Sequence, residues 1–367
     1  AYEISIRDWS SDVCSSDLKT TFLLQYAKEK FGFDRSCLFV NMNNFYFSQY
    51  SLVDFAGEFV KRGGKVLLID QVFKLPDWSH DLRICYERYP NLKIVFTGSS
   101  VMRLKDENPE LNGIVRSYNL RGFSFREFLN LQTGNHFSSY SLEEILTNHE
   151  HIAKTILPHT NPLNYFQDYI HHGFYPFFLE KRNFSENLLK TMNMMIEVDI
   201  LLIKQIELKY LSKIKKLLYL LAVDGPVAPN VSQLAADIQT SRATVMNYIK
   251  YLADARLINM VYPKGEVFPK KPAKIMMHNT NLMYSIYPVK VEEQDVLETF
   301  FVNSLWKDHK VNKGEKGTSF LVDESLNFRI CSEGYKFKNS PNIYYAMHKS
   351  ELGHGNQIPL WLFGFLY

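Results

Sequence analysis

The sequence has few cysteines and no long apolar run. Its four cysteines, among 367 residues, show neither paired spacing nor metal-ligand spacing, so we expect free thiols in a reducing cytoplasm. No apolar run approaches membrane-spanning length, and the N-terminus lacks the apolar core of a signal peptide. A net charge of +3 is too small to indicate nucleic-acid binding by itself. Length and composition instead predict roughly two or three globular domains.

Two apolar segments predict buried parallel strands with polar residues at their C-terminal ends. Residues 66–69 are apolar and are followed by Asp70, and residues 93–96 are followed by the polar run that contains Ser99. Open α/β sheets bind their ligands at this end of the strands. The alternative that the sequence leaves open is an ordinary α/β domain in which one strand happens to end in an acid.

A Lys-Thr pair precedes both strands, at the start of a predicted amphipathic helix. Lys19, Thr20 and Thr21 occupy this position. Together with Asp70 and Ser99 they form the layout that is typical of a P-loop nucleotidase. In that layout the lysine and the helix dipole bind phosphates, Thr20 and Asp70 bind Mg²⁺, and Ser99 senses the γ-phosphate.

Residues 1–18 do not resemble the rest of the chain. Residues 8–18 look like the translation of a sequencing adapter, so we exclude residues 1–18 from fold reasoning and expect them to make few native contacts. In the pattern G-x-x-x-x-G-K-[ST], glycines should precede Lys19 at positions 13 and 18. Val13 and Leu18 stand there instead. We therefore expect the glycines and the first strand of the sheet to be missing.

The rest of the chain divides by its patterns of apolar residues. Residues 19–135 alternate between helix and strand and predict the ATPase core. Residues 136–205 are helical and predict a lid or connector. Residues 206–272 predict a helix-turn-helix followed by a wing. Residues 273–367 predict a small α/β domain.

The predicted helix-turn-helix has a polar face and an apolar face, and the apolar residues that can share one small core are Leu234, Ile238, Val245, Ile249 and Leu252. Its second helix should direct Arg242, Thr244, Asn247 and Lys250 outward, where they could contact DNA. Few of the outward residues are basic, although phosphate contacts usually dominate such binding. A winged helix that serves as a spacer or as an oligomer contact therefore remains an open alternative.

The order of elements after residue 292 suits a nuclease-like fold. Glu298 lies on a predicted helix, Asp323 ends a predicted strand, and further strands are expected at residues 328–331, 343–346 and 360–367. A Mg²⁺-dependent nuclease needs an acid and an E-x-K motif on the following strand. Arg329 stands where that acid should be, with Glu333 and Lys336 displaced. We therefore expect no metal-dependent nuclease activity.

These motifs together resemble a known family. The segments are 19–21, 68–70, 96–100 and 123–128, and the chain looks like the prokaryotic AAA+ family ATPases that carry a C-terminal PD-(D/E)XK nuclease-like domain. The resemblance covers residues 19–367. It implies a P-loop NTPase parallel sheet, a helical lid, a winged helix and a nuclease-like domain, with ATP and Mg²⁺ as cofactors.

The resemblance also assigns roles to single residues. Lys19 is similar to the phosphate-binding lysine, Thr20 and Asp70 to the Mg²⁺ ligands, and Ser99 to the γ-phosphate sensor. Arg116 lies close to where the family carries basic residues. The family has a catalytic glutamate after its Asp, whereas this chain has Gln71.

From these features we expect an ATP-binding protein with impaired hydrolysis. The alternative is a DNA-binding or protein-interaction module that uses the winged helix, with the ATPase fold as its scaffold. We expect no membrane partner, and self-association is left open.

Overall fold

The computed structural model describes residues 16–98, 109–116, 120–180, 183–201, 204–289, 291–306, 308–334 and 340–367. The chain divides into two compact units, Ala1–Gly122 and Phe123–Tyr367. The expectation that residues 1–18 make few contacts concerns mainly residues 1–15, which lie outside the described residues.

The first unit alternates helices with parallel strands. Its helices are α1 (Ser16–Phe31), α2 (Leu52–Lys61) and α3 (Trp78–Arg88), and its strands are β1 (Cys37–Asn41), β2 (Val66–Asp70) and β3 (Lys93–Phe96). In the described part of this unit the strands pair in the order β1-β2-β3. The parallel sheet confirms the α/β fold class expected for this part of the chain.

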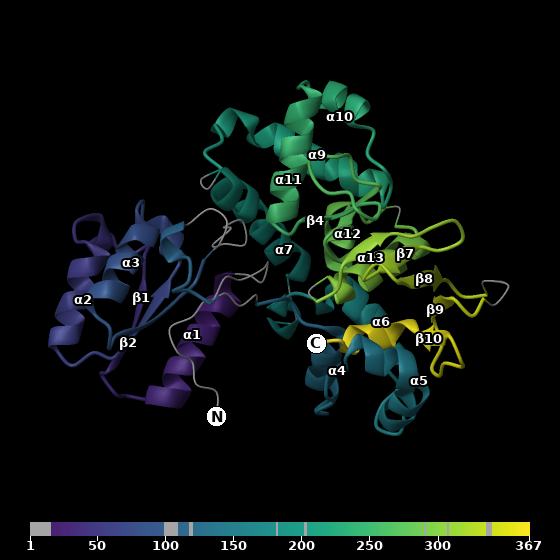
Figure 1. Ribbon diagram of the computed structural model, residues 1–367, viewed down its shortest axis with the longest axis horizontal. Coiled ribbons are helices and arrows are strands. Elements are labelled where there is room, and N and C mark those ends of the chain that lie inside the picture. Colours follow the sequence, from purple (N-terminus) through teal and green to yellow (C-terminus); the bar gives the residue numbers. More distant parts are fainter. Residues whose placement is uncertain are drawn as a thin grey trace. The chain divides into compact units, whose positions relative to one another are not determined.

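Strand β2 lies at the centre of this sheet, and all of its residues are buried. Side chains alternate between the two faces of a strand. Val66 and Leu68 accordingly pack against Leu23 of α1, while Leu67 and Ile69 are buried on the opposite face. Helix α1 lies on one side of the sheet, and α2 and α3 lie on the other (Figure 1). Burial on both faces explains the continuous apolar run.

In the described part of the second unit, most helices precede the first strand in the chain, and the last two lie between the second and third strands. The helices are α4 (Phe125–Thr133), α5 (Leu142–Ile156), α6 (Leu163–Asp168), α7 (Phe184–Met194), α9 (Leu211–Asp224), α10 (Val231–Asp237), α11 (Arg242–Asp254), α12 (Thr280–Ile286) and α13 (Glu293–Leu305). The strands are β4 (Ile258–Val261), β5 (Lys274–Met277), β6 (Val311–Lys313), β7 (Phe320–Val322), β8 (Leu326–Cys331), β9 (Ile343–Met347) and β10 (Gln357–Pro359).

The larger sheet of this unit has the order β10-β9-β8-β7-β6 within the described residues. Strands β6, β7 and β8 pair antiparallel, whereas β8, β9 and β10 pair parallel. Helix α13 contributes Phe300 and Phe301 to the core, where Phe301 stacks on Phe320 of β7 at a centroid distance of 5.8 Å. The sheet and α13 thus form one core.

Helices α9, α10 and α11 precede a two-stranded antiparallel pair, β4 and β5. The apolar positions expected to share a small core here are all buried: Leu234, Ile238, Val245, Ile249 and Leu252. Ser241 caps α11, and its side-chain oxygen accepts the backbone N–H of Thr244 at 3.1 Å. The apolar periodicity of this segment therefore gave its buried positions correctly.

The segment 360–367 differs from its sequence prediction. Leu360–Phe365 is a 3₁₀-helix, not a strand. Its aromatic residues Trp361, Phe363 and Phe365 are all buried. Gly364 lies so close to α4 that an added Cβ would meet the Cβ of Phe125 at 2.5 Å. A run of apolar residues does not distinguish a strand from another fully buried segment, which explains the error.

Candidate functional site

The carboxyl edge of the first sheet carries a buried acid, Asp70, at the end of β2. The register places Asn41 of β1 opposite Asp70, and Ile69 opposite Phe96, so Thr97 follows directly beside the acid. Asp70 is fully buried and Thr97 is 4% exposed. The parallel strands therefore place the side chains of Asn41, Asp70 and Thr97 next to one another at the carboxyl edge of the sheet.

Three side chains donate hydrogen bonds to the Asp70 carboxylate. Oδ2 accepts Thr20 Oγ1 of α1 at 2.8 Å and Asn41 Nδ2 at 2.8 Å, and Oδ1 accepts Thr97 Oγ1 at 2.6 Å. A buried carboxylate is costly unless it is hydrogen-bonded, and charge-assisted bonds of this kind are among the stronger ones. The Asp70 carboxylate thus has its hydrogen-bond partners within the protein. These bonds connect α1 to β1, to β2 and to the residue that follows β3.

Gln71 is held next to the acid by its backbone and by its side chain. Its backbone is left-handed, with φ of 57°, and its N–H donates to Thr97 Oγ1 at 2.8 Å. Its Oε1 accepts Asn43 Nδ2 at 3.0 Å. Thr97 therefore links Asp70 to Gln71, because its hydroxyl donates to the first and accepts from the second.

Helix α1 begins earlier than the sequence predicts. The expected start was Lys19, whereas the helix begins at Ser16. Lys19 and Thr20 are half-buried and Thr21 is exposed. The Thr20 hydroxyl reaches the Asp70 carboxylate. The first-turn N–H groups, which give a helix N-terminus its affinity for anions, accordingly lie before Lys19.

Two other residues, Ser99 and Arg116, were predicted for this site. Ser99 lies outside the described residues. Arg116 is exposed. Conversely, Asn41, Asn43 and Thr97 were not singled out by sequence reasoning. The sequence pattern that could have identified them is the one that identified Asp70, because each is a polar residue at or just after the end of an apolar strand.

Mg²⁺ fits the oxygen atoms gathered here. It prefers hard oxygen ligands and commonly uses one or two carboxylates, with water and substrate phosphates completing its shell. The Thr20 hydroxyl and the Asp70 carboxylate lie 2.8 Å apart on two different elements. Among the described residues no group of three or more His, Cys, Asp and Glu side chains is placed to hold a metal. The donor set therefore suits a Mg²⁺ that arrives with a phosphate ligand.

The four residues considered for DNA contact all lie on α11. Arg242 and Asn247 are exposed, whereas Thr244 and Lys250 are half-buried. The Thr244 hydroxyl lies 2.8 Å from Ser241 Oγ, and the Lys250 ammonium pairs with Asp254 one turn later. The exposed polar surface of α11 is thus carried mainly by Arg242 and Asn247.

The acids considered for a nuclease site lie on or next to different elements of the second unit. Glu298 of α13 pairs with Lys274 at 2.5 Å. Asp323 follows β7, and its carboxylate accepts Lys310 N at 2.9 Å and lies 2.7 Å from His309 Nδ1. Glu333 is exposed and pairs with Lys349, and Lys336 lies outside the described residues. Each described acid thus has a basic partner.

Comparison with known proteins bears on the first unit. Residues 19–129 match the family model of an AAA domain. The matched range contains Thr20, Asp70 and Gln71, which supports an ATPase-like nucleotide-binding module of P-loop type. A second model, described as a domain of unknown function, matches residues 163–290.

A relative of this chain is the uncharacterized protein MJ1637 of Methanocaldococcus jannaschii. The two are 28% identical over 210 residues, which is 56% of this chain and 44% of the relative. The match therefore spans less than half the length of that protein. Separately, in the described part of this chain, no helix has both the length and the apolar character needed to cross a membrane.

Proposed function

We propose that the first unit binds ATP with Mg²⁺ at the carboxyl edge of its sheet. The observation that carries this proposal is the hydrogen bond from Thr20 Oγ1 to Asp70 Oδ2 at 2.8 Å. It brings the helix that carries the Lys-Thr pair to the acid at the end of the central strand, as phosphate and metal binding require. Lys19 would bind the phosphates, with Thr21 beside it, and Ser99 and Arg116 would respond to the γ-phosphate.

Thr20 and Asp70 would hold the Mg²⁺. A bound Mg²⁺ neutralises charge that develops on the phosphate oxygens. Asn41 and Thr97 would keep the Asp70 carboxylate in place, since each donates a hydrogen bond to it. These two residues therefore act on the site through Asp70.

Hydrolysis should be slow in this chain for two separate reasons. Val13 and Leu18 stand where glycines would let the backbone approach the phosphates closely, so their main effect is on binding. Gln71 can orient a water molecule but cannot accept its proton, so its effect is on the chemical step. A general base typically contributes about 10² to 10⁴ in rate, which is enough for Gln71 alone to suppress turnover.

The test repairs the two defects in turn. Val13→Gly with Leu18→Gly should restore Mg-ATP affinity, measured by calorimetry, with little gain in turnover. Adding Gln71→Glu should then raise ATP turnover by about 10²-fold or more. Asp70→Asn in the repaired protein is the control, because it removes the charge proposed to hold Mg²⁺. If the protein with glycines alone already turns over ATP as fast as the triple variant, the role assigned to Gln71 is wrong.

A second candidate function is DNA binding through α11, in line with the proposed domain division. That division gives residues 136–205 a lid role, makes residues 206–272 a winged helix, and makes residues 273–367 nuclease-like. The observation in favour is that Arg242 and Asn247 are exposed on one helix. Retention on duplex DNA should fall with salt and be lost in Arg242→Ala. Lys190→Ala, which removes a charge from α7, should leave retention unchanged, and equal effects of the two variants would count against this function.

A further inference from the structure

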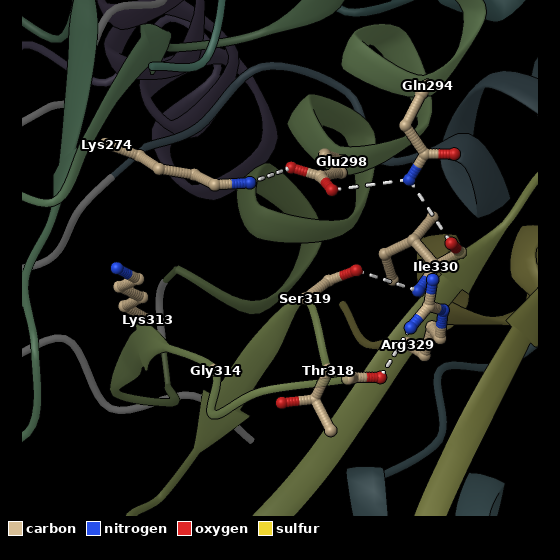
Figure 2. Close-up of a pocket in the computed structure, with 10 residues that line it drawn as sticks. Lys274, Gln294, Glu298, Lys313, Gly314, Thr318, Ser319, Arg329 and Ile330 are labelled. Carbon is tan, nitrogen blue, oxygen red and sulfur yellow. Dashed lines mark hydrogen bonds and ion pairs between the residues drawn. The ribbon is translucent and has the colours of Figure 1, made fainter. Parts of the chain in front are cut away.

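A cavity of about 440 Å³ lies in the second unit, between α13 and the β6–β7 end of the large sheet. Figure 2 shows the side chains around it: Lys274 of β5 and Glu298 of α13 lie along one side, Lys313 of β6 and Arg329 of β8 on the others. These elements are separate in sequence and meet in the folded second unit. The volume falls in the range of small-molecule sites, which is roughly 300 to 1,000 Å³.

The cavity carries an excess of positive charge. Glu298 is its acidic member, and it is buried and already paired with Lys274 at 2.5 Å. Gln294 Nε2 lies 3.3 Å from the other Glu298 oxygen, Oε1, and donates to the carbonyl oxygen of Ile330 at 3.2 Å. The Glu298 charge is therefore compensated from both sides, and Lys313 and Arg329 add two further cations to the lining.

The groups that face the cavity are suited to donate hydrogen bonds. Arg329 uses Nη1 to donate to the carbonyl oxygen of Gly317 at 2.7 Å, which fixes the guanidinium beside the cavity. Ser319 Oγ accepts the backbone N–H of Ile330 at 3.2 Å, and this bond does not use the hydroxyl proton, which can be donated to a ligand. Lys313, at the end of β6, is exposed. An ammonium, a guanidinium and a hydroxyl donor together match the oxygens of a phosphate group.

The loop between β6 and β7 is built tightly around this position. An added Cβ on Gly314 would lie 2.4 Å from Thr318 Oγ1 and 2.8 Å from the backbone nitrogen of Phe320. Thr318 Oγ1 donates to the carbonyl oxygen of Glu315 at 3.0 Å, which closes the loop on itself. The close packing keeps Thr318 and Ser319 at the cavity wall.

We propose that this cavity binds the phosphate group of a small phosphorylated molecule, with Lys313, Arg329 and Ser319 as its ligands. A metal ion does not suit the lining, because its one carboxylate is already paired with a lysine. The small volume favours a phosphate monoester over a nucleic-acid strand. This site is separate from the ATP site proposed for the first unit and does not depend on it.

The test measures binding of ribose 5-phosphate by calorimetry, with ribose as the uncharged reference. Lys19→Ala is used as the background throughout, which removes the lysine proposed for ATP. Ribose 5-phosphate should bind and ribose should not. Lys313→Ala should raise the dissociation constant about tenfold, because one charged contact is lost. Lys316→Ala is the matched control, since it removes an exposed lysine of the same loop that does not line the cavity, and it should change affinity by less than about twofold.

Ser319→Ala tests the hydroxyl donor with little change in charge or size, and it should also weaken binding. The proposal is overturned if ribose 5-phosphate does not bind, or if Lys316→Ala weakens binding as much as Lys313→Ala. It is equally overturned if a single-stranded oligonucleotide binds through Lys313 while the sugar phosphate does not, since the site would then serve nucleic acid.

Discussion

At the scale of single residues, Thr97 is the most consequential side chain that the sequence did not single out. Its one hydroxyl donates to Asp70 Oδ1 at 2.6 Å and accepts from Gln71 N at 2.8 Å. Removing it leaves a buried carboxylate oxygen and a backbone N–H each without one partner. The cost of such orphaned groups exceeds the modest net value of the bonds themselves.

Thr97→Val should therefore destabilise the first unit by about 1 to 3 kcal/mol, as measured by urea unfolding. The change keeps the shape of the side chain and removes only the hydroxyl. Thr97→Ser is the matched control, since it keeps the hydroxyl and loses a methyl group. Equal loss in both variants would mean that packing of the methyl group, and not the two hydrogen bonds, determines stability here.

His149 of α5 gives a second prediction, on pH. The ring is 4% exposed, and neither ring nitrogen has a hydrogen-bond partner among the described residues. Burial lowers the pKa of His149, against a smaller opposing effect of Glu150. The unfolded chain therefore binds a proton at His149 more readily than the folded chain does. The stability that the neutral, buried ring allows is fully present above a pH of about 6.5, and it is lost as the pH falls toward the pKa of His149 in the folded protein.

His149→Phe should accordingly flatten the loss of stability on acidification below a pH of about 6.5, followed by urea unfolding at a series of pH values. His151→Phe replaces an exposed ring on the same helix and serves as the control. An identical pH profile for the wild type and His149→Phe would show that other groups cause the acid sensitivity.

At the scale of elements, the sequence correctly predicts those helices and strands that are determined by their own short pattern of residues. The apolar run of β2 lies where the sequence predicts it. The start of α1 and the terminal 3₁₀-helix were missed. The first depended on residues that we excluded, and the second on an apolar run that does not distinguish a strand from another buried segment.

The cluster around Asp70 shows the same limit of sequence reasoning. Asp70 and Thr20 follow from motif spacing, and the structure brings them together. Asn41 joins them because β1 and β2 pair in a register that sets Asn41 opposite Asp70. Register between strands far apart in the chain is set by packing of the whole sheet, which no local pattern of one strand specifies.

The two capping boxes of the second unit offer a matched pair for an element-scale test. Ser124 and Glu127 cap α4, and Ser141 and Glu144 cap α5, in each case with reciprocal hydrogen bonds. Ser124 is 1% exposed and also donates to the backbone oxygen of Tyr367 at 2.8 Å, whereas Ser141 is exposed. The same cap therefore lies in two environments.

Ser141→Ala should cost about 1 kcal/mol of unfolding free energy, which is the usual value of an N-cap. Ser124→Ala should cost more, about 2 kcal/mol, because the hydrogen bond to the Tyr367 backbone oxygen is lost as well, although Arg126 Nε still donates to that oxygen at 2.9 Å. Chemical denaturation of the two variants checks the order. A smaller loss for Ser124→Ala would show that its link to Tyr367 does not contribute to stability.

At the scale of the whole molecule, the chain is two compact units with their own cores. The proposed ATP site lies entirely in the first unit, and the proposed phosphate cavity lies entirely in the second. A ligand stabilises the part of a protein that must unfold to release it, by an amount set by its concentration relative to its dissociation constant. Each ligand should thus stabilise the unit that binds it and leave the stability of the other unit unchanged.

Hydrogen exchange can test this separation of the units directly. In the protein with Val13→Gly and Leu18→Gly, Mg-ATP at about a hundred times its dissociation constant should slow the slowest-exchanging amides of β1, β2 and β3, by about a hundredfold. Amides of α13 and β8 should keep their rates, because nothing proposed for ATP lies in that unit. Asp70→Asn in the same background controls for effects of ATP that do not require the site. Equal slowing in both units would mean that they unfold as one cooperative body, and the division at Gly122 would then not hold for stability.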